Sequence, residues 1–261
     1  FRALSALDQA LWDVLGKSLD APVHALLGGA SRDEIRLYAN INRATRGDRS
    51  PEAFARNATA AVSDGFDAIK LAPFDGLARG IDKAEDAADG IACMQAVRQA
   101  IGPNVDLLID CHSHFTAKGA LAVAKALADL DLFWFEEPVP DEDIAGYLEV
   151  KAKSGLPIAG GENRMHRRGF WQACNDNILD IAMPDVTIVG GICELKKVAA
   201  MAEARGIRTA PHGPFGPVTT ASSVHAMAAH PAFAILEYAW GEVPWRPTLT
   251  LPNEKISNGR I

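Results

Sequence analysis

Three carboxylate residues recur at a constant interval in the sequence. Asp110, Glu136 and Glu162 are separated by 26 residues twice in succession, and each follows a short apolar run. That interval fits one strand–loop–helix–loop unit of a parallel fold, in which neighbouring strands lie about 4.8 Å apart. Carboxylates brought so close need a compensating charge, and an all-oxygen set suits a hard divalent cation. The interval therefore predicts a site for one Mg²⁺ ion.

The stretch "FWFEEPVP" (133–140) contains two adjacent acids after a run of aromatic residues. Neighbouring residues of a strand point to opposite faces, so only one of the pair can face the metal. The 26-residue interval selects Glu136 rather than Glu137 as the ligand.

A carboxylate and an imidazole follow two later apolar runs. Asp185 ends the sixth predicted strand and His212 the seventh. A carboxylate beside an imidazole fixes its tautomer and raises its basicity. A histidine so placed near a metal is a good general base, so we expect His212 to remove a proton with Asp185 as its partner.

Other polar side chains stand at the ends of the predicted strands. His112 shares a strand face with Asp110 by the period of two, so it is expected to point into the site. His114 is in the same register but lies further into the loop, and His166 in "RMHRR" is placed at the mouth of the site. The remaining strand-associated candidates are Lys70, Asn163 and Glu237.

Eight short apolar runs alternate with seven amphipathic stretches, of which the clearest helices span 51–65, 117–130 and 194–206. Continuous apolar strands are typical of a parallel sheet covered by helices on both faces. Eight such units predict a closed α/β barrel, whose chemistry lies at the carboxyl ends of the strands. An open doubly wound sheet is the alternative, but the first predicted strand lacks the glycine-rich nucleotide loop that usually follows it there. The predicted strands span 35–41, 67–74, 105–112, 132–139, 157–163, 178–185, 207–213 and 234–240.

The two ends of the chain differ from this repeat. Residues 1–29 predict a helix, a break at Pro22 and a short second helix that ends at Gly28–Gly29. Residues 241–261 are rich in proline and then faintly strand-like. Neither end is expected to close a domain of its own.

The composition excludes several classes of protein. The 261 residues carry a net charge of −7 with acids and bases interspersed, so a basic footprint for nucleic acid is missing. No apolar run approaches the length of a membrane span, and the first residues lack the layout of a signal peptide. The four cysteines are scattered without a CxxC pair. They predict reduced thiols in a cytoplasmic protein and no thiolate zinc site.

With these residues in place, the sequence resembles the enolase superfamily, in its mandelate racemase and acid-sugar dehydratase branch. The resemblance covers essentially the whole chain and is carried by "SALDQALWDVLGKSLDAPVHALLGG", "LLIDCH", "FWFEEP", "GGEN", "MPDVTIVGGI" and "APHG". It implies a modified TIM barrel, (β/α)₇β, with the N-terminal α+β capping domain largely missing from this chain. The expected parts are a helical remnant of that domain (1–34), the catalytic barrel (35–240) and a segment returning toward the cap (241–261).

The resemblance also implies roles for individual residues. Asp110, Glu136 and Glu162 match the Mg²⁺ ligands, and Asp185 with His212 matches the Asp–His base pair. Glu237 matches a carboxyl group that contacts the carboxylate end of the substrate. "DCH" matches the Asp-x-His of some sugar-acid dehydratases, which makes His112 the general acid for the leaving hydroxide.

One departure bears on the reaction. Racemase-like members carry Lys-x-Lys on the second strand, whereas this sequence has Lys70-Leu71-Ala72. Ala72 cannot move a proton, so His212 is left as the principal base and Lys70 is expected to orient or neutralise the substrate carboxylate.

The expected activity is Mg²⁺-dependent dehydration of an aldonate or aldarate to a 2-keto-3-deoxy acid, by a hydro-lyase. An epimerase, racemase or cycloisomerase on the same scaffold is the first alternative, with Lys70 as a second base. A barrel that binds metal without catalysis is the second. The resemblance implies a homo-oligomer, either a dimer or an octamer, with a small carboxylate as its substrate.

Overall fold

The computed structural model describes residues 1–261, and its elements follow the predicted alternation of strands and helices. The chain divides into two compact units. The first unit comprises Phe1–Leu37, Gly161–Tyr238 and Pro244–Ile261, and the second comprises Tyr38–Gly160 and Ala239–Val243. None of the helices combines the length and the apolar character that a membrane span requires.

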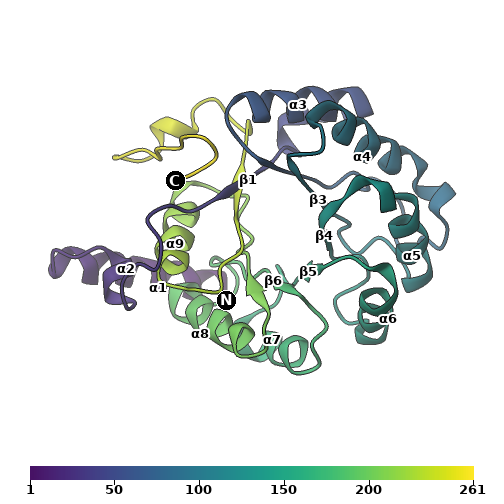
Figure 1. Cartoon of the computed structure of the whole chain (residues 1–261). Helices are drawn as coiled ribbons and strands as arrows, with labels where there is room; N and C mark the ends of the chain where they lie inside the picture. Colours follow the sequence, from purple (N-terminus) through teal and green to yellow (C-terminus); the bar gives the residue numbers. More distant parts are fainter. The chain divides into compact units, whose positions relative to one another are not determined.

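Five parallel strands form the sheet of the second unit, in the order β5-β4-β3-β2-β1. The connecting helices lie on the outer side of these strands (Figure 1). All five strands were predicted, and each is shorter than its apolar run. The strands are β1 (Leu37–Asn40), β2 (Ala68–Leu71), β3 (Asp106–Asp110), β4 (Leu132–Glu136) and β5 (Ile158–Gly160), and the α-helices are α3 (Pro51–Ser63), α4 (Ala88–Ile101), α5 (Ala117–Ala126) and α6 (Ile144–Ser154).

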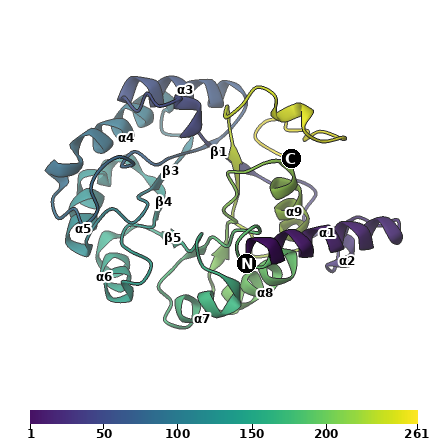
Figure 2. The same ribbon diagram turned by 180° about the vertical axis from the view of Figure 1, so that it is seen from behind.

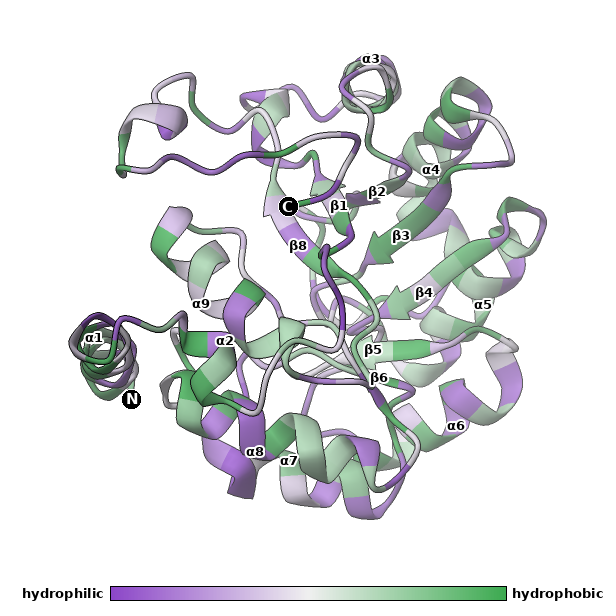
Figure 3. Cartoon of the chain, turned by 60° about the vertical axis from the view of Figure 1, so that its left-hand side comes forward, coloured by the Kyte–Doolittle hydropathy of each residue, from purple (hydrophilic) through white to green (hydrophobic).

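The sheet of the second unit is apolar on both faces. Every residue of β1, β2 and β5 is buried, and β3 and β4 are drawn mainly in the hydrophobic colour (Figure 3). Burial of both faces explains why these strands read as continuous apolar runs. A lysine or carboxylate on such a strand has to find a charged partner within the protein.

Caps and one close approach fix the helices between these strands. Ser50 accepts a hydrogen bond from the Ala53 N–H, and Pro51 occupies the first turn of α3, as the sequence predicts. Gly119 in the first turn of α5 has to be glycine for a different reason. A Cβ atom there would lie 1.9 Å from the carbonyl oxygen of Ile81, which crosses the start of the helix.

The first unit contains the last three strands and the remaining α-helices. Its strands β6 (Ile181–Ala182) and β7 (Arg208–Thr209) pair in parallel, and β8 (Leu236–Ala239) is the last strand of the chain. The sixth and seventh predicted strands are therefore confirmed, but only two residues of each keep strand geometry. The helices are α1 (Arg2–Ser18), α2 (Val23–Leu26), α7 (His166–Asn175), α8 (Gly191–Glu203) and α9 (Pro217–Ala228).

The predicted pair of N-terminal helices is confirmed, and α1 runs beside α8 (Figure 2). Asp8 of α1 accepts a hydrogen bond from the Cys193 N–H at 3.1 Å, and Ser5 accepts one from the Gly190 N–H at 3.0 Å. Both N–H groups lie at the start of α8, where a helix leaves its first donors unpaired. Side chains of α1 therefore cap α8. Gly191 completes the fit, because a Cβ atom there would lie 2.3 Å from a carboxylate oxygen of Asp8.

The prediction of a strand-like C-terminal segment is wrong. Residues 244–261 contain one short 3₁₀ turn (Arg246–Thr248) and isolated bridges, among them Arg36 with Arg260. The segment is held instead by the buried Arg246, which pairs with Glu254 at 2.8 Å and donates to Thr220 at 2.9 Å. A side-chain anchor replaces the hydrogen-bond ladder that a strand would supply.

Candidate active site

Two buried carboxylates and one lysine meet at the ends of neighbouring strands in the second unit. Asp110 of β3 is paired in register with Glu136 of β4, as their spacing predicts. The Nζ atom of Lys70 on β2 lies 3.0 and 3.1 Å from the two oxygens of Glu136 and 3.6 Å from Asp110. All three side chains are at most 3% exposed, so they depend on one another for charge compensation.

Aromatic side chains support this cluster. The indole Nε1–H of Trp134 donates to Glu136 at 3.0 Å. The Lys70 ammonium lies 5.3 Å from the ring centre of Tyr38, which packs edge-on against Trp134. Burial by itself would raise the pKa of Asp110. The nearby charges of His112 and Lys70 outweigh it and lower that pKa, so the carboxyl group is ionised.

The register argument is wrong for Glu162. In the sheet, Glu136 lies opposite Ala159 rather than opposite a carboxylate. Strand β5 ends at Gly160, and Gly161 turns the chain with a φ of +103°, a conformation that favours glycine. Glu162 therefore follows this turn, three positions after the residue paired with Glu136, and the equal intervals do not reflect equal positions on the strands.

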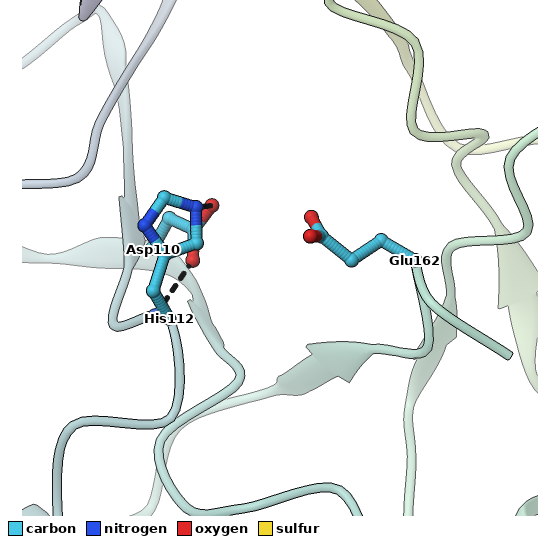
Figure 4. Close-up of side chains that lie close together, drawn as sticks. All are labelled: Asp110, His112 and Glu162. Atoms are coloured by element: carbon cyan, nitrogen blue, oxygen red, sulfur yellow. Dashed lines mark hydrogen bonds and ion pairs between the residues drawn. The ribbon is translucent and has the colours of Figure 1, made fainter. Parts of the chain in front are cut away.

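His112 lies beside Asp110, but not because both belong to one strand face. Strand β3 ends at Asp110, and His112 and Ser113 have φ values of +43° and +59°. The resulting turn brings the His112 Nε2 atom within 3.1 Å of an Asp110 oxygen, while its backbone N–H donates to the other oxygen at 3.0 Å (Figure 4). His112 therefore lies close to Asp110, as predicted, but strand alternation is not the reason.

A second carboxylate holds the other nitrogen of His112. The Nδ1 atom lies 2.5 Å from Asp75, which follows β2 in the chain. Burial by itself would lower the pKa of His112. The charge of Asp110 and hydrogen bonds to Asp110 and Asp75 outweigh it and raise that pKa to about 11. The imidazole is therefore a protonated group that can donate from both nitrogens.

The next histidine belongs to the same loop. The backbone oxygen of His114 accepts from the N–H groups of Gly80 and Ile81, and its Nδ1 atom lies 3.1 Å from the Ala78 oxygen. These contacts join the β3–α5 loop to residues 78–81. They give His114 a structural role, and its role in binding substrate stays a prediction.

In the first unit, His212 is surrounded by three acids. Its Nδ1 atom lies 2.7 Å from Asp185, and its Nε2 atom lies 3.1 Å from Glu162 and 3.8 Å from Glu237. The contact with Asp185 fixes the orientation of the ring, and Nε2 is directed toward Glu162 and Glu237. The pairing of imidazole and carboxylate expected from the sequence is present.

The acids around His212 are themselves held in place. One oxygen of Asp185 accepts from the N–H and the hydroxyl of Thr187, at 2.6 and 2.7 Å. Its other oxygen is thereby directed at His212. Glu237 on β8 accepts from the Gly213 N–H at 2.8 Å. Such hydrogen bonds fix the orientation of an imidazole–carboxylate pair, as supporting contacts do around metal ligands.

Two further candidates have partners nearby in the first unit. The Asn163 amide donates to Glu162 at 3.1 Å. The Nε2 atom of His166 lies 3.2 Å from Glu194, which also accepts from the Arg167 N–H and from Lys197. His166 therefore belongs to an ion-pair group at the start of α7 and α8, and its contact with substrate stays a prediction.

A cavity of about 1310 Å³ in the first unit is lined by two residues that contact the Asp185–His212 pair, but by neither member of the pair. Its wall includes Thr187, which bonds to Asp185, and Phe215, whose ring lies edge-on to that of His212 at 5.9 Å. Most of the remaining wall comes from α1, α9 and residues 250–255. Thr187 and Phe215 therefore contact the pair and also face this cavity.

Sequence reasoning missed Asp75, Trp134 and Thr187, which each bond to a candidate residue. Thr187 carried a local signal, because a Thr two residues after an Asp often bonds back to it. The only sequence feature that pointed to Asp75 was its position, one residue beyond the predicted second strand. The sequence indicated only that Trp134 is an aromatic residue of the core.

Comparison with known proteins identifies the family. A family model described as "Enolase C-terminal domain-like" matches residues 53–261, and the model of the mandelate racemase/muconate lactonizing enzyme N-terminal domain matches residues 1–28. The chain belongs to the enolase superfamily. Membership places it in the mandelate racemase-like branch near the acid-sugar dehydratases and confirms the predicted fold class, the (β/α) barrel of the C-terminal domain.

Relatives within the superfamily are similar along nearly the whole chain. D-gluconate dehydratase of Thermoproteus tenax is 36% identical over 99% of this chain and 52% of its own length. D-galactarolactone cycloisomerase of Agrobacterium fabrum is 33% identical over 99% of this chain and 68% of its own length. A solved enolase-superfamily structure from Salmonella Typhimurium matches with a TM-score of 0.91 at 31% identity, covering 99% of this chain and 71% of that one. The chain thus spans about half the length of the gluconate dehydratase.

Proposed function

We propose that the protein containing this chain is a Mg²⁺-dependent hydro-lyase that converts an aldonate or aldarate into a 2-keto-3-deoxy acid. The named sugar-acid dehydratase among its relatives supports the substrate class. The observation that carries the proposal is the position of His112, whose imidazole lies between the carboxylates of Asp75 and Asp110. An elimination needs an acid for the leaving hydroxide, whereas a proton transfer at one carbon does not.

The carboxylates offer a suitable donor set for the metal. Asp110 and Glu136 are buried, ionisable oxygen ligands in register, and they already have a cation, Lys70, within 3.6 Å. Hard oxygen donors of this kind suit Mg²⁺. We assign Asp110, Glu136 and Glu162 as its ligands. When bound, the ion would supply Lewis-acid charge that stabilises negative charge developing on the substrate carboxylate.

The chain's own residues would move the protons. The Nε2 atom of His212 takes the proton from C2, while Asp185 keeps the imidazole oriented through Nδ1. The electron pair of the C2–H bond forms a C2–C3 double bond, and the C3–O bond breaks. His112 donates a proton to the departing hydroxyl, which leaves as water, and the enol tautomerises to the 2-keto acid.

Lys70 fits an electrostatic role in this scheme. Its ammonium lies within 3.6 Å of two carboxylates, which favour the charged form over the neutral amine that a base requires. With Ala72 in place of a second lysine, His212 is the base, and Glu237 is assigned to the carboxylate end of the substrate.

The test is a screen of mono- and diacid sugars with the full-length protein and Mg²⁺, scored for 2-keto acid formation. Proton NMR of the product in D₂O identifies the reaction, since dehydration yields a keto-deoxy acid. Products that keep all hydroxyls and carry deuterium at C2 would exclude dehydration.

A cycloisomerase is the second candidate, because one relative carries that name at 33% identity. It would act on a lactone, and its product would retain every oxygen of the substrate. The same NMR experiment with sugar-acid lactones separates it from the dehydratase. The domain boundaries near residues 34 and 240, the dimeric or octameric state and the cytoplasmic location also remain proposals.

A further inference from the structure

Four side chains of the second unit form a continuous chain of polar contacts. Arg49 Nη2 lies 3.2 Å from one oxygen of Asp75, and the other oxygen of Asp75 lies 2.5 Å from His112 Nδ1. On the far side of the ring, His112 Nε2 lies 3.1 Å from Asp110. The imidazole is thus held between one acid assigned to the metal and one acid that has no assigned role.

The backbone does not determine the direction of His112 by itself. The residue lies beyond the end of β3 with a φ of +43°, so the alternation of a strand no longer governs its side chain. A half turn of the ring about the Cβ–Cγ bond would exchange Nδ1 with the Cδ2 carbon and Nε2 with the Cε1 carbon. A fixed acceptor for Nδ1 prevents that exchange.

Asp75 is well placed to be this acceptor. It follows β2, and Arg49 ties the turn together because its guanidinium also donates to the backbone oxygen of Ala72. Asp75 and His112 are each 35% exposed at the side chain. The pair therefore remains open to a molecule arriving from solvent, while its own geometry is maintained by Arg49 and Asp110.

We infer that Asp75 is a positioning residue for the dehydration step: it holds His112 by Nδ1 so that Nε2 delivers the proton to the departing hydroxyl. The inference rests on the proposed function. Asp75 itself touches neither the substrate nor the reacting atoms in this assignment, so it should affect elimination without affecting removal of the C2 proton.

The first test compares two reactions of the full-length protein. Asp75→Asn should lower 2-keto acid formation by about 10- to 100-fold, the usual effect of removing such a supporting partner. Exchange of the C2 proton with D₂O should stay near the parental rate. Asp75→Glu should recover part of the activity, and Asp75→Asn combined with His112→Asn should lose no more than His112→Asn alone. Asp86→Asn, an exposed acid of the same unit, is the matched control and should leave both reactions unchanged.

The outcomes separate this inference from the proposed function. Equal loss of exchange and dehydration in Asp75→Asn, or unimpaired dehydration, would overturn the positioning role. Absence of keto-acid formation by the parent would instead refute the proposed function.

A second measurement does not depend on turnover. In ¹⁵N-labelled protein, the His112 ring signals, assigned by their loss in His112→Asn, should show an Nδ1 proton in a strong hydrogen bond. That signature should disappear in Asp75→Asn and persist in Asp86→Asn. An unchanged Nδ1 signal in Asp75→Asn would overturn the inference whether or not the parent is active.

Discussion

Replacing Lys70 by Met tests whether one ammonium group compensates the two buried acids of the second unit. Met has a similar length and apolar stem, so the change removes the charge with little loss of packing. In the parent, Nζ lies 3.0 Å from Glu136 and 3.6 Å from Asp110, and all three side chains are at most 3% exposed. At an effective dielectric constant of 20, one unit-charge pair at 3.0 Å is worth about 5.5 kcal/mol.

The expected loss of stability is smaller than this Coulomb energy, because the variant no longer has to desolvate the ammonium. Removing one partner of a buried ion pair typically costs about 3–5 kcal/mol. We expect a decrease of that size in the free energy of unfolding, measured by urea denaturation at pH 7 in EDTA. Lys118→Met, at an exposed position of α5, is the control and should change stability by less than about 0.5 kcal/mol.

The loss of stability in Lys70→Met should depend on pH. In the parent, nearby positive charges lower the pKa of Asp110, so its stabilising contribution is lost only as the pH falls below the ordinary range of an aspartate. Without Lys70, Asp110 still has the charge of His112 beside it, whereas the buried Glu136 loses its cation, and burial disfavours the charged form of an unpaired carboxyl group. The variant therefore loses stability as the pH rises. The difference between variant and parent should therefore shrink between pH 7 and pH 5. A loss below about 1 kcal/mol at pH 7, or a difference that grows on acidification, would refute this account of the cluster.

Other consequences follow from the site and from the packing. Added Mg²⁺ should raise the urea midpoint of Lys70→Met, since a bound cation would compensate the same two carboxylates; an unchanged midpoint at millimolar Mg²⁺ would count against their role as ligands. His212→Asn should lower turnover by about 10²–10⁴-fold and abolish C2 exchange while leaving the circular dichroism spectrum unchanged, and exchange at the parental rate would show that another residue is the base. Gly119→Ala should lower the melting temperature by about 5–10 °C, because its Cβ would lie 1.9 Å from the Ile81 oxygen, whereas Gly216→Ala meets no atom within 4 Å and should shift it by less than about 2 °C.

Much of the fold could be predicted from the sequence, because hydrophobic periodicity is a local property. Each of the eight predicted strands is present, and the helices between them begin and end near the predicted proline and glycine residues. The strands are shorter than their apolar runs, since an apolar residue beyond the last ladder bond is buried equally well in a loop. The same ambiguity made the apolar C-terminal residues look strand-like.

The pairing of Asp110 with Glu136 and of Asp185 with His212 also followed from the order of residues along the chain. Both predictions used the rule that parallel strands end at the same edge of the sheet, and Asp185 and His212 meet although each lies three residues beyond its strand. Glu162 escaped that rule, because a turn at Gly161 separates it from the ladder and its distance from β5 is not set by strand geometry.

The contact between His112 and Asp75 was decided by the tertiary structure alone. The period of two stops at Asp110, and the left-handed turn at His112 redirects the imidazole toward Asp75, 37 positions earlier in the chain. No local pattern encodes that meeting, since it depends on how two loops pack against each other. The order of residues thus determined which side chains reach the edge of the sheet, and the folding of the loops decided which of them touch.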